Sequence, residues 1–288
     1  MKVGITLGEP AGIGPEVVRK ALKSGKLPRG FQYEVIGSTT GVVPGKLTKH
    51  SATLTLTALE VAVKKWRNGE IAAVVTGPVQ KEQLSRVGFA YPGQTEFFAA
   101  RCGLPLNHPV MMLTDRRLTV SLLSTHCSLL EAIQQIKPSK MRQVIELTHE
   151  HLQRLNKRKP RLAVAGVNPH AGENGLFGKE EQTIFKPVIQ EYQRKGILIS
   201  GPHSPDTIFH RASHGEFDAV ICSYHDQGLI PFKLLAFATG VNVTLGLPLI
   251  RTSPDHGTAL DLAGKNQADP RSMIEAIKLA CKLVRTKE

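Results

Sequence analysis

Three histidines fall at equivalent places in the sequence, each at the end of a short apolar run. His126 ends the segment LLSTH, His170 ends AGVNPH and His225 ends ICSYH. Such runs are typical of buried strands, and ligands of open α/β sheets bind beyond the carboxyl ends of the strands. Three neutral imidazoles that leave a coordination position open are the usual ligands of a catalytic divalent metal ion. Each histidine alone is more often an ordinary side chain, but the three together favour a shared metal site.

Acidic and basic side chains accompany these histidines. Asp206 follows a Gly-Pro-His-Ser-Pro turn, and Asp226 directly follows the last of the three histidines. A carboxylate beside a metal can act as a base or can orient an imidazole, although Asp206 is equally suited to cap the next helix. Lys233, Asn242 and Arg251 come later, in mainly apolar segments. A cation there often pairs with a phosphate or a carboxylate, and an exposed cation at a strand edge is the alternative.

Two glycine-rich turns have the composition of small-anion sites. The first is GEPAGIGPE over residues 8–16, and the second is NPHAGENGLFG, with Gly172, Gly175 and Gly178. Neither has the G-x-G-x-x-G spacing of a dinucleotide fingerprint or the Lys-Ser/Thr of a Walker loop. The first turn is equally consistent with a tight strand-to-helix connection. A dinucleotide that binds this chain therefore does so without the usual Rossmann turn.

Short apolar runs alternate with helical stretches along the chain. Strands that alternate with helices predict an α/β protein with a largely parallel sheet. The predicted strands are 3–7, 33–36, 71–75, 118–123, 162–167, 219–222 and 241–245. The predicted helices are 53–67, 96–102, 129–156 with an interruption at Pro138, 183–195 and 270–285, and the amphipathic segment 17–25 is a further helical stretch after the first glycine-rich turn. His149 and His151 fall on the third of these helices and are expected to be exposed.

Composition bounds the class of protein. The 288 residues carry 37 Lys and Arg against 24 Asp and Glu, a formal net charge of +13. Such a charge attracts nucleic acid, membrane surfaces or small anions. Aromatic residues make up only 5% and do not interleave with basic ones as they do in single-strand binders. The densest basic run, residues 154–161, is best explained as a solvated helix end. We therefore expect no nucleic acid partner, and a basic nucleic-acid-binding protein is only a remote alternative.

Cysteine spacing and the N-terminal segment bear on the compartment. The four cysteines are far apart and form no CxxC pair, so structural disulfides are not expected and a reducing compartment fits. The N-terminal MKVGITLGEP lacks the long apolar region of a signal peptide, and no run of about 18 apolar residues is present. The sequence thus predicts a cytoplasmic protein without a membrane partner.

A series of motifs resembles the 4-hydroxythreonine-4-phosphate dehydrogenases of vitamin B6 (pyridoxal phosphate) biosynthesis. The motifs are GEPAGIGPE, TGPVQKE, PGQTEFFA, STHCSL, VNPHAGENGLFG, GPHSPDTIF, YHDQGLIPFK and VNVTLGLPLIRTSPDHGTALDLAG. The likeness extends from Lys2 to about Gly264. It implies a two-domain α/β/α fold similar to isocitrate and isopropylmalate dehydrogenases, with an active-site cleft between the domains. The implied domains are an outer one of residues 1–90 and 228–288, and an inner one of residues 91–227 with the dimer interface.

The resemblance also implies a reaction and its cofactors. NAD oxidises 4-phosphooxy-L-threonine to a β-keto acid, which loses carbon dioxide to give 3-amino-2-oxopropyl phosphate. One divalent ion (Zn, Mg, Mn or Co) per active site would act as a Lewis acid on the substrate hydroxyl, and the metal site of the homodimer is completed across the interface. Asp206, Asp226 or Lys233 would accept the hydroxyl proton, as a hypothesis drawn from their chemistry.

Single residues match the family's functional positions. The metal-binding histidines of the family match His126, His170 and His225. Its substrate-binding positions match Thr95, Lys233, Asn242 and Arg251, and Gln94 is expected to join them although its residue type differs from the family's. The family stretch near NAD matches Asp255, His256, Gly257 and Thr258.

The chain departs from the family pattern in two places. The triplet after Pro-Gly is Gln94–Thr95–Glu96, where the family usually has His-Thr-Glu, and a glutamine cannot carry the charge of an imidazole. The stretch after Ile36 is also shorter than in typical members. Gln94 favours an alternative function, in which a sister enzyme of the same fold acts on a four-carbon sugar-acid phosphate such as threonate or erythronate phosphate.

Overall fold

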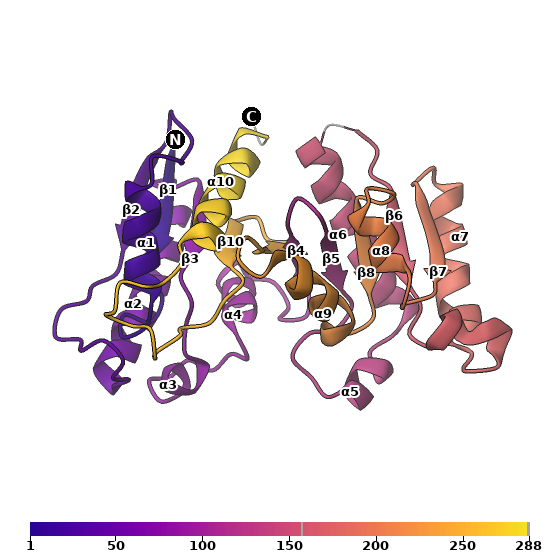
Figure 1. Cartoon of the computed structure of the whole chain (residues 1–288), viewed down its shortest axis with the longest axis horizontal. Coiled ribbons are helices and arrows are strands. Elements are labelled where there is room, and N and C mark those ends of the chain that lie inside the picture. Colours follow the sequence, from indigo (N-terminus) through magenta and orange to yellow (C-terminus); the bar gives the residue numbers. More distant parts are fainter. Residues whose placement is uncertain (157, 287–288) are drawn as a thin grey trace. The chain divides into compact units, whose positions relative to one another are not determined.

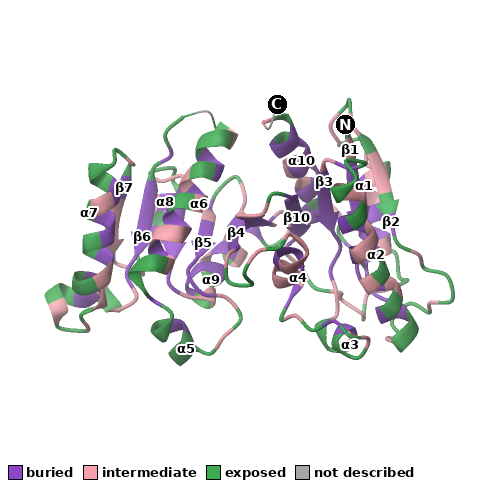
Figure 2. Cartoon of the chain, turned by 180° about the vertical axis from the view of Figure 1, so that it is seen from behind, coloured by how far each residue is buried: buried purple, intermediate pink, exposed green. Residues whose placement is uncertain are grey.

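The structure, a computed structural model, describes residues 1–156 and 158–286. The chain divides into two compact units (Figure 1). Unit 1 consists of Met1–Pro109 and Ala238–Glu288, and unit 2 is the continuous segment Val110–Phe237. In both units the strands are mostly buried, whereas many helical residues are exposed (Figure 2). Each unit therefore has a core of its own, built around its strands.

Unit 1 is built on strands in the order β2-β1-β3-β10-β9. The pairs β1–β2, β1–β3 and β3–β10 are parallel, whereas β9 and β10 are antiparallel. The strands are β1 (Lys2–Thr6), β2 (Gln32–Ile36), β3 (Ala73–Thr76), β9 (Val241–Leu245) and β10 (Ile250–Pro254). The helices are α1 (Gly14–Lys23), α2 (Lys49–Arg67), α3 (Lys81–Ser85), α4 (Gln94–Arg101) and α10 (Arg271–Arg285).

Local sequence explains the two long helices of unit 1. α2 begins at a capping box, in which the hydroxyl of Thr48 accepts the N–H of Ser51 at 3.0 Å and the hydroxyl of Ser51 accepts the N–H of Thr48 at 3.2 Å. α10 presents an apolar stripe that includes Ile274, Ile277 and Cys281, and it packs on β10 and β3. These helices bury the strands that carry part of the candidate site.

Unit 2 has strands in the order β4-β5-β8-β6-β7. β4 and β5 are antiparallel, and the other neighbours are parallel. The strands are β4 (Val110–Thr114), β5 (Thr119–Leu122), β6 (Leu162–Ala165), β7 (Ile199–His203) and β8 (Ala219–Cys222). The helices are α5 (Leu129–Gln134), α6 (Pro138–Asn156), α7 (Lys186–Arg194), α8 (Ile208–Ser213) and α9 (His225–Ala236), with two short turns of helix, η1 (Pro169–Gly175) and η2 (Glu181–Phe185).

The predicted α/β class with a largely parallel sheet is confirmed, and so is the helix interruption at Pro138, where α6 begins. Three strands, β4, β7 and β10, and three helices, α3, α8 and α9, were not predicted. The longest of these helices, α9, was missed because Gly228 and Pro231 interrupt its helical pattern. The antiparallel pairs that β4 and β10 form were missed with them.

The compact units divide at Pro109/Val110 and Phe237/Ala238. The limits predicted from the sequence are 90/91 and 227/228. The observed and predicted limits differ because the helices α4 and α9 belong to other units than the prediction gave them. α4 places Phe97 and Phe98 in a core cluster of unit 1, and α9 places Leu229 and Phe232 in the core of unit 2.

One histidine corrects an expectation. His151, expected to be exposed, is 6% exposed on α6 and lies inside unit 2. Its neighbours Met141, Val144, Ile145 and Leu152 on the same helix are buried as well. The face of α6 that carries His151 therefore points into the core. The sequence did not predict this, because polar residues directly precede the histidine.

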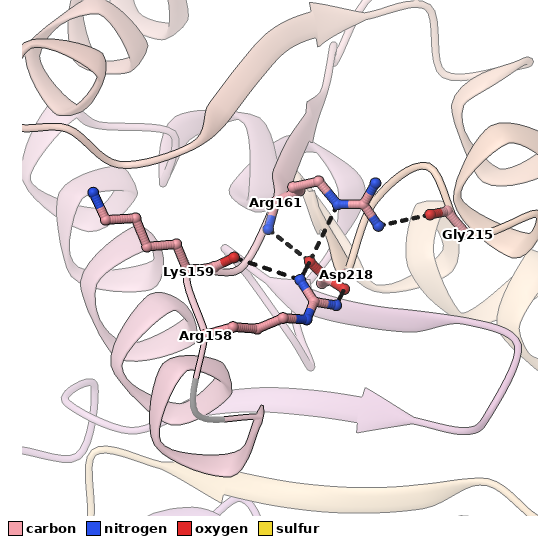
Figure 3. A network of polar contacts seen from close by, with 5 residues as sticks. All are labelled: Arg158, Lys159, Arg161, Gly215 and Asp218. Atoms are coloured by element: carbon pink, nitrogen blue, oxygen red, sulfur yellow. Dashed lines mark hydrogen bonds and ion pairs between the residues drawn. The ribbon is translucent and has the colours of Figure 1, made fainter.

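The basic run 154–161 includes Lys157, which lies outside the described residues. Two of its arginines bind one carboxylate (Figure 3). Arg158 Nη1 donates to Asp218 Oδ2 at 3.0 Å, and the backbone N–H of Arg161 donates to the same oxygen at 2.7 Å. Burial by itself would raise the pKa of Asp218, but these hydrogen bonds hold it below its usual value. Arg158 and Arg161 therefore link the segment before β6 to the segment before β8 through Asp218.

All four cysteines, Cys102, Cys127, Cys222 and Cys281, carry free thiols, as predicted. Across the two described ranges, no helix is long and apolar enough to cross a membrane.

Candidate functional site

Two of the three strand-end histidines line one pocket of unit 2. The pocket has a volume of about 580 Å³ and lies where the segments after β5 and β8 meet. The ring centroids of His126 and His225 are 5.7 Å apart, and the ring planes are inclined at 45°. The other lining residues are Thr125, Cys127, Ser128, Leu129, Glu131, Ala132, Tyr224 and Asp226. Two imidazoles at this separation can face a common ligand.

Strand order explains why these histidines are neighbours. β5 and β6 both pair in parallel with β8, so the carboxyl ends of the three strands lie at one edge of the sheet. His126 follows β5, His170 follows β6, and His225 is the first residue of α9, shortly after β8. The predicted placement of the three histidines beyond the ends of strands in one sheet is confirmed.

His225 is oriented by the residue that follows it. Its Nδ1 lies 2.6 Å from Oδ1 of Asp226. In such a pair the Nδ1–H donates to the carboxylate, and Nε2 keeps its lone pair for another ligand. The Asp226 side chain is 69% exposed, so it remains in contact with solvent while it holds the ring.

His170 lies in a turn with an unusual backbone. Residues 170–174 all have positive φ, between 39° and 79°, although only Gly172 among them is a glycine. This left-handed conformation is sterically unfavourable for other residues. His170 is exposed and is not among the described residues that line the pocket. The pKa of Asp206 is lowered chiefly by a 2.6 Å hydrogen bond from Ser204 and also by the charge of His170, so these two predicted site residues lie within electrostatic range.

The donor types suit a divalent ion, but one chain does not gather a full set. Imidazole is a ligand for zinc, cobalt and related ions. Within residues 1–156 and 158–286 of a single chain, no three His, Cys, Asp or Glu side chains lie close enough together to hold a metal ion. One chain presents a pair, His126 and His225, with His170 on the neighbouring turn. A three-histidine site needs a movement of that turn or a ligand from a second chain.

Unit 1 holds a buried cation, Arg251, for which the described residues supply no ion pair. Arg251 on β10 is 4% exposed. Its guanidinium donates to the hydroxyl oxygens of Thr76 and Thr244, with Nη2–Oγ1 at 2.8 Å and Nη1–Oγ1 at 3.0 Å, and lies 5.9 Å from the ring centre of Phe98. Burial lowers the pKa of Arg251 to about 10, and the charge of Glu96 partly offsets the shift. No carboxylate of the described chain forms an ion pair with it, so the charge is available to an anion.

Register places other polar side chains on the same face. Arg251 lies opposite Thr244 in the antiparallel pair of β10 and β9, and directly opposite residues share a face. Asn242 lies two residues before Thr244 and therefore faces the same way. Its Oδ1 is buried and accepts no hydrogen bond from the described residues. Thr76 and Thr244 were not singled out in the sequence, because a threonine in a strand has no signature of its own.

The first turn of α4 lies beside this cluster. The amide of Gln94 donates to the carbonyl of Gly77, directly after Thr76, at 3.3 Å. Gln94 Oε1 and Glu96 Oε2 are both buried and accept no hydrogen bond within the part of the chain described here. Thr95 is half-buried between them. Three of the predicted substrate-binding residues, Gln94, Asn242 and Arg251, are thus arranged around β3, β9 and β10.

The predicted NAD loop packs on the first glycine-rich turn. The carbonyl of Thr258 accepts the N–H of Ile13 at 2.9 Å, and a Cβ added to Gly12 would lie 2.7 Å from that carbonyl oxygen. A Cβ added to Gly14 would lie 1.9 Å from the carbonyl oxygen of Leu7, so the turn requires glycine there. The segment 8–16 is therefore a tight strand-to-helix connection, which is one of the two interpretations that its sequence allows. Asp255, His256 and Gly257 precede Thr258 in the loop, and nothing lies within 4 Å of a Cβ added to Gly257.

The remaining predicted residue, Lys233, lies on α9 in unit 2 and is half-buried. It is thus on the same helix as His225, whereas Arg251, Asn242 and Gln94 belong to unit 1.

Comparison with known proteins gives a consistent picture. The family described as pyridoxal phosphate biosynthetic protein PdxA matches residues 16–280. A 4-hydroxythreonine-4-phosphate dehydrogenase of Zymomonas mobilis is 39% identical, over 96% of this chain and 94% of that protein. A protein of Oceanobacillus iheyensis, provisionally named D-threonate 4-phosphate dehydrogenase, is 38% identical, over 99% of this chain and 98% of that protein.

Solved structures agree with these relatives. The 4-hydroxythreonine-4-phosphate dehydrogenase of Klebsiella pneumoniae matches with a TM-score of 0.81 and 35% identity, over 98% of this chain and 99% of that one. Isocitrate dehydrogenase of Methylococcus capsulatus matches with a TM-score of 0.53 at 15% identity, over 98% of this chain and 84% of that one, and so shares the fold alone. The predicted likeness to the isocitrate dehydrogenase fold is confirmed.

Proposed function

Because this chain belongs to the PdxA family of pyridoxal phosphate biosynthetic proteins, we propose that it is an NAD-dependent dehydrogenase of 4-phosphooxy-L-threonine. The product is a β-keto acid, which loses carbon dioxide to give 3-amino-2-oxopropyl phosphate. The observation that carries the proposal is the buried guanidinium of Arg251, whose hydrogen-bond partners are the hydroxyl groups of Thr76 and Thr244.

A buried cation of this kind selects for an anionic substrate. A guanidinium taken out of water costs several kcal/mol unless a negative charge compensates it. Its planar donors match the oxygens of a phosphate or carboxylate. Gln94, Thr95 and Asn242 supply neutral polar groups nearby, which can bind the remaining oxygens. The phosphate of the substrate is the anion that we assign to this cluster.

The histidines hold the divalent ion in the proposed enzyme. His126 and His225 face one pocket, and Asp226 holds the His225 ring with Nε2 available. A divalent ion bound by imidazoles supplies a Lewis acid that lowers the pKa of a substrate hydroxyl. Asp206, Asp226 and Lys233 are the candidate acceptors of the hydroxyl proton. The loop 255–258 would bind NAD, because it matches the family stretch near that cofactor, and nothing lies within 4 Å of a Cβ added to Gly257.

A homodimer would complete the site. α9 exposes an apolar stripe of Ile230, Leu234 and Phe237, which are 68%, 85% and 74% exposed. Exposed apolar residues at helical spacing mark a contact surface. The helix that carries them begins at His225. A second copy that covers this stripe would therefore lie next to the histidine pair, where one chain alone does not gather three ligands.

α5 extends the same surface. Leu129, Leu130 and Ile133 are 57%, 67% and 40% exposed, and Leu129 lines the pocket together with His225. Leu129 of α5 and His225 of α9 thus line one pocket, and exposed apolar residues follow each of them on its own helix.

Gln94 favours an alternative substrate, a four-carbon sugar-acid phosphate. Gln94 replaces the histidine that is usual in the family, and a relative at 38% identity carries the D-threonate 4-phosphate name. A four-carbon sugar-acid phosphate keeps the phosphate and the hydroxyl to be oxidised but replaces the amine by a hydroxyl. The same chemistry would then serve another pathway.

The test is turnover measured by absorbance of the reduced nicotinamide, with NAD or NADP and a divalent ion. 4-Phosphooxy-L-threonine and D-threonate 4-phosphate are offered separately. We expect faster turnover of the first substrate. If only the second is turned over, D-threonate 4-phosphate replaces 4-phosphooxy-L-threonine as the assigned substrate.

The role of the ion is tested by one variant. The His170→Ala variant should lose both bound metal and turnover while it stays folded. Retained turnover in metal-free buffer would contradict the proposed role of the ion.

A further inference from the structure

Buried polar side chains join the turns that carry the histidines. Gln227, in the first turn of α9, is only 8% exposed. Its Oε1 accepts the N–H of Ser223 at 2.6 Å, and its Nε2 donates to the carbonyl of Gly166 at 2.7 Å. Ser223 lies just before His225, and Gly166 lies just before the turn with His170. One side chain therefore links these two turns.

The link extends to the third histidine turn. Ser124, two residues before His126, is buried and donates its hydroxyl to the carbonyl of Ser223 at 2.9 Å. Ser223 is thus bonded through its N–H to Gln227 and through its carbonyl to Ser124. In a buried place such hydrogen bonds are strong, because water does not compete for them. The three strand ends are therefore held in a fixed relation.

A second buried side chain shapes the turn that carries His170. Glu181 is 1% exposed. Its Oε1 accepts the N–H groups of Val167 at 2.9 Å and of Asn168 at 2.8 Å, and its Oε2 accepts the side-chain amide of Asn168 at 2.9 Å. No Lys or Arg in the described ranges pairs with this carboxylate. It is satisfied by amide donors, all of them in the segment that leads into the turn.

Glu181 fits closely against the backbone. A Cβ added to Gly172 would lie 2.7 Å from Oε2, and one added to Gly166 would lie 3.2 Å from Oε1. Glycine at these positions lets the chain approach the carboxylate. Residues 170–174 adopt a left-handed conformation that their own side chains disfavour, so contacts from outside the turn must maintain it. Glu181 supplies such contacts.

We infer that Gln227 and Glu181 are positioning residues for the metal-binding histidines. Glu181 keeps the turn that carries His170 in its left-handed shape, and Gln227 fixes that turn relative to His225. Each acts through the backbone that precedes a histidine. The inference rests on the proposed function, in which His170 and His225 bind the divalent ion.

The test is a titration of metal-free, full-length protein with Co²⁺, followed by the visible absorbance of the bound ion. Gln227→Met keeps the size of the side chain and removes both hydrogen bonds. Gln193→Met is the control for the same substitution at an exposed glutamine of this unit, because Gln193 donates a single bond to the carbonyl of Ile199 at 2.8 Å. Denaturant unfolding of both variants compares their stability.

Glu181→Gln is the second variant. It replaces one acceptor oxygen by an amide donor that faces N–H groups, and it changes the size of the side chain little. The neighbouring Glu180 accepts one bond from Asn168 at 2.8 Å, so Glu180→Gln is its control.

Changes behind metal ligands cost about 10- to 100-fold in metal affinity. We expect this loss, with an altered Co²⁺ spectrum, in Gln227→Met and Glu181→Gln. The controls should bind Co²⁺ within about twofold of the parent protein, a change far below the loss expected behind a ligand. If Gln227→Met does not fold, Gln227→Glu takes its place, since it keeps the acceptor for Ser223 but opposes the carbonyl of Gly166.

Unchanged Co²⁺ affinity and spectrum in Gln227→Met and Glu181→Gln would overturn the inference. His170→Ala and His225→Ala distinguish this failure from a failure of the proposed function. If these two variants lose Co²⁺ while the positioning variants keep it, only the inference fails. If they keep Co²⁺, the metal assignment itself fails.

Discussion

The guanidinium of Arg251 donates to the hydroxyl oxygen of Thr76 through Nη2 at 2.8 Å and through Nε at 3.2 Å. A neutral hydroxyl satisfies these hydrogens but forms no ion pair, and the charge of Glu96 compensates the buried positive charge only in part. The folded chain therefore carries an electrostatic cost at this position, which an arriving anion offsets.

Arg251→Met tests this relationship by separating binding from stability. Loss of the guanidinium should lower kcat/KM on the order of 100-fold, mainly through a higher KM, because the phosphate loses its charged partner. The free energy of unfolding should stay unchanged or rise, since a buried unpaired charge is removed. Steady-state kinetics and urea unfolding measure the two effects.

Arg101→Met is the matched control in the same unit. Arg101 forms hydrogen bonds with Glu60 and with Tyr91, so its loss should reduce stability and leave kcat/KM unchanged. Equal kinetic losses in the two variants would mean that Arg251 acts through the fold alone.

His151 should make stability depend on pH. Burial lowers its pKa to about 4, with the charge of Arg154 adding to the shift, from 6.5 for an ordinary histidine. Between these values the unfolded chain binds a proton that the folded chain does not bind, so stability is fully present above pH 6.5 and is lost as the pH falls toward 4. From pH 7 to pH 5 we expect a loss of about 2 kcal/mol.

Urea unfolding at a series of pH values measures this loss. His151→Leu should remove it, whereas the exposed His214→Leu should keep it. An identical pH profile in the parent protein and His151→Leu would assign the effect to other groups.

An alanine-to-glycine substitution should have opposite effects on stability in the left-handed turn and in a helix. Ala171 has φ 52°, so Ala171→Gly should raise the free energy of unfolding by about 1 kcal/mol by removing the steric conflict of Cβ. Ala100 lies inside α4, and Ala100→Gly should lower it by about 1 kcal/mol. Thermal unfolding compares the two, and a loss of stability in both would show that Ala171 is not strained.

The apolar stripe on α9 predicts that a single charge controls assembly. Leu234 is 85% exposed, and Leu234→Arg should convert the proposed dimer to a monomer in sedimentation velocity, because a buried unpaired charge is costly. Leu198, 49% exposed before β7, provides the control variant Leu198→Arg. A parent protein that sediments as a monomer would refute the dimer.

Sequence patterns predicted the elements that share one recurring pattern, a buried strand followed by a histidine. The apolar runs before His126, His170 and His225 placed these residues beyond strands, because buried parallel strands have a recognisable composition. β10 was missed although it carries Arg251, since the segment Ile250–Pro254 mixes apolar and polar residues and pairs through its backbone. Arg251 itself was singled out as a cation among apolar residues, and the substrate-binding role proposed for it comes from the resemblance to a family.

Residues that act through the backbone escaped prediction altogether. Gln227 and Glu181 bind the carbonyl of Gly166 and the N–H groups of Val167 and Asn168, and every residue offers such groups. Their positions depend on tertiary structure. The left-handed conformation of residues 170–174 was not predicted either, because it depends on tertiary contacts and Gly172 is the only glycine in the stretch.

The division of the chain has a consequence for its synthesis on the ribosome. Unit 2 is the continuous segment Val110–Phe237, whereas unit 1 needs Ala238–Glu288 for β9, β10 and α10. The nascent chain can therefore complete unit 2 while the edge of β3 that will receive β10 is still unpaired. An unpaired strand edge is prone to aggregation, so the interval before the C-terminal segment emerges is the stage at which chaperones should matter most.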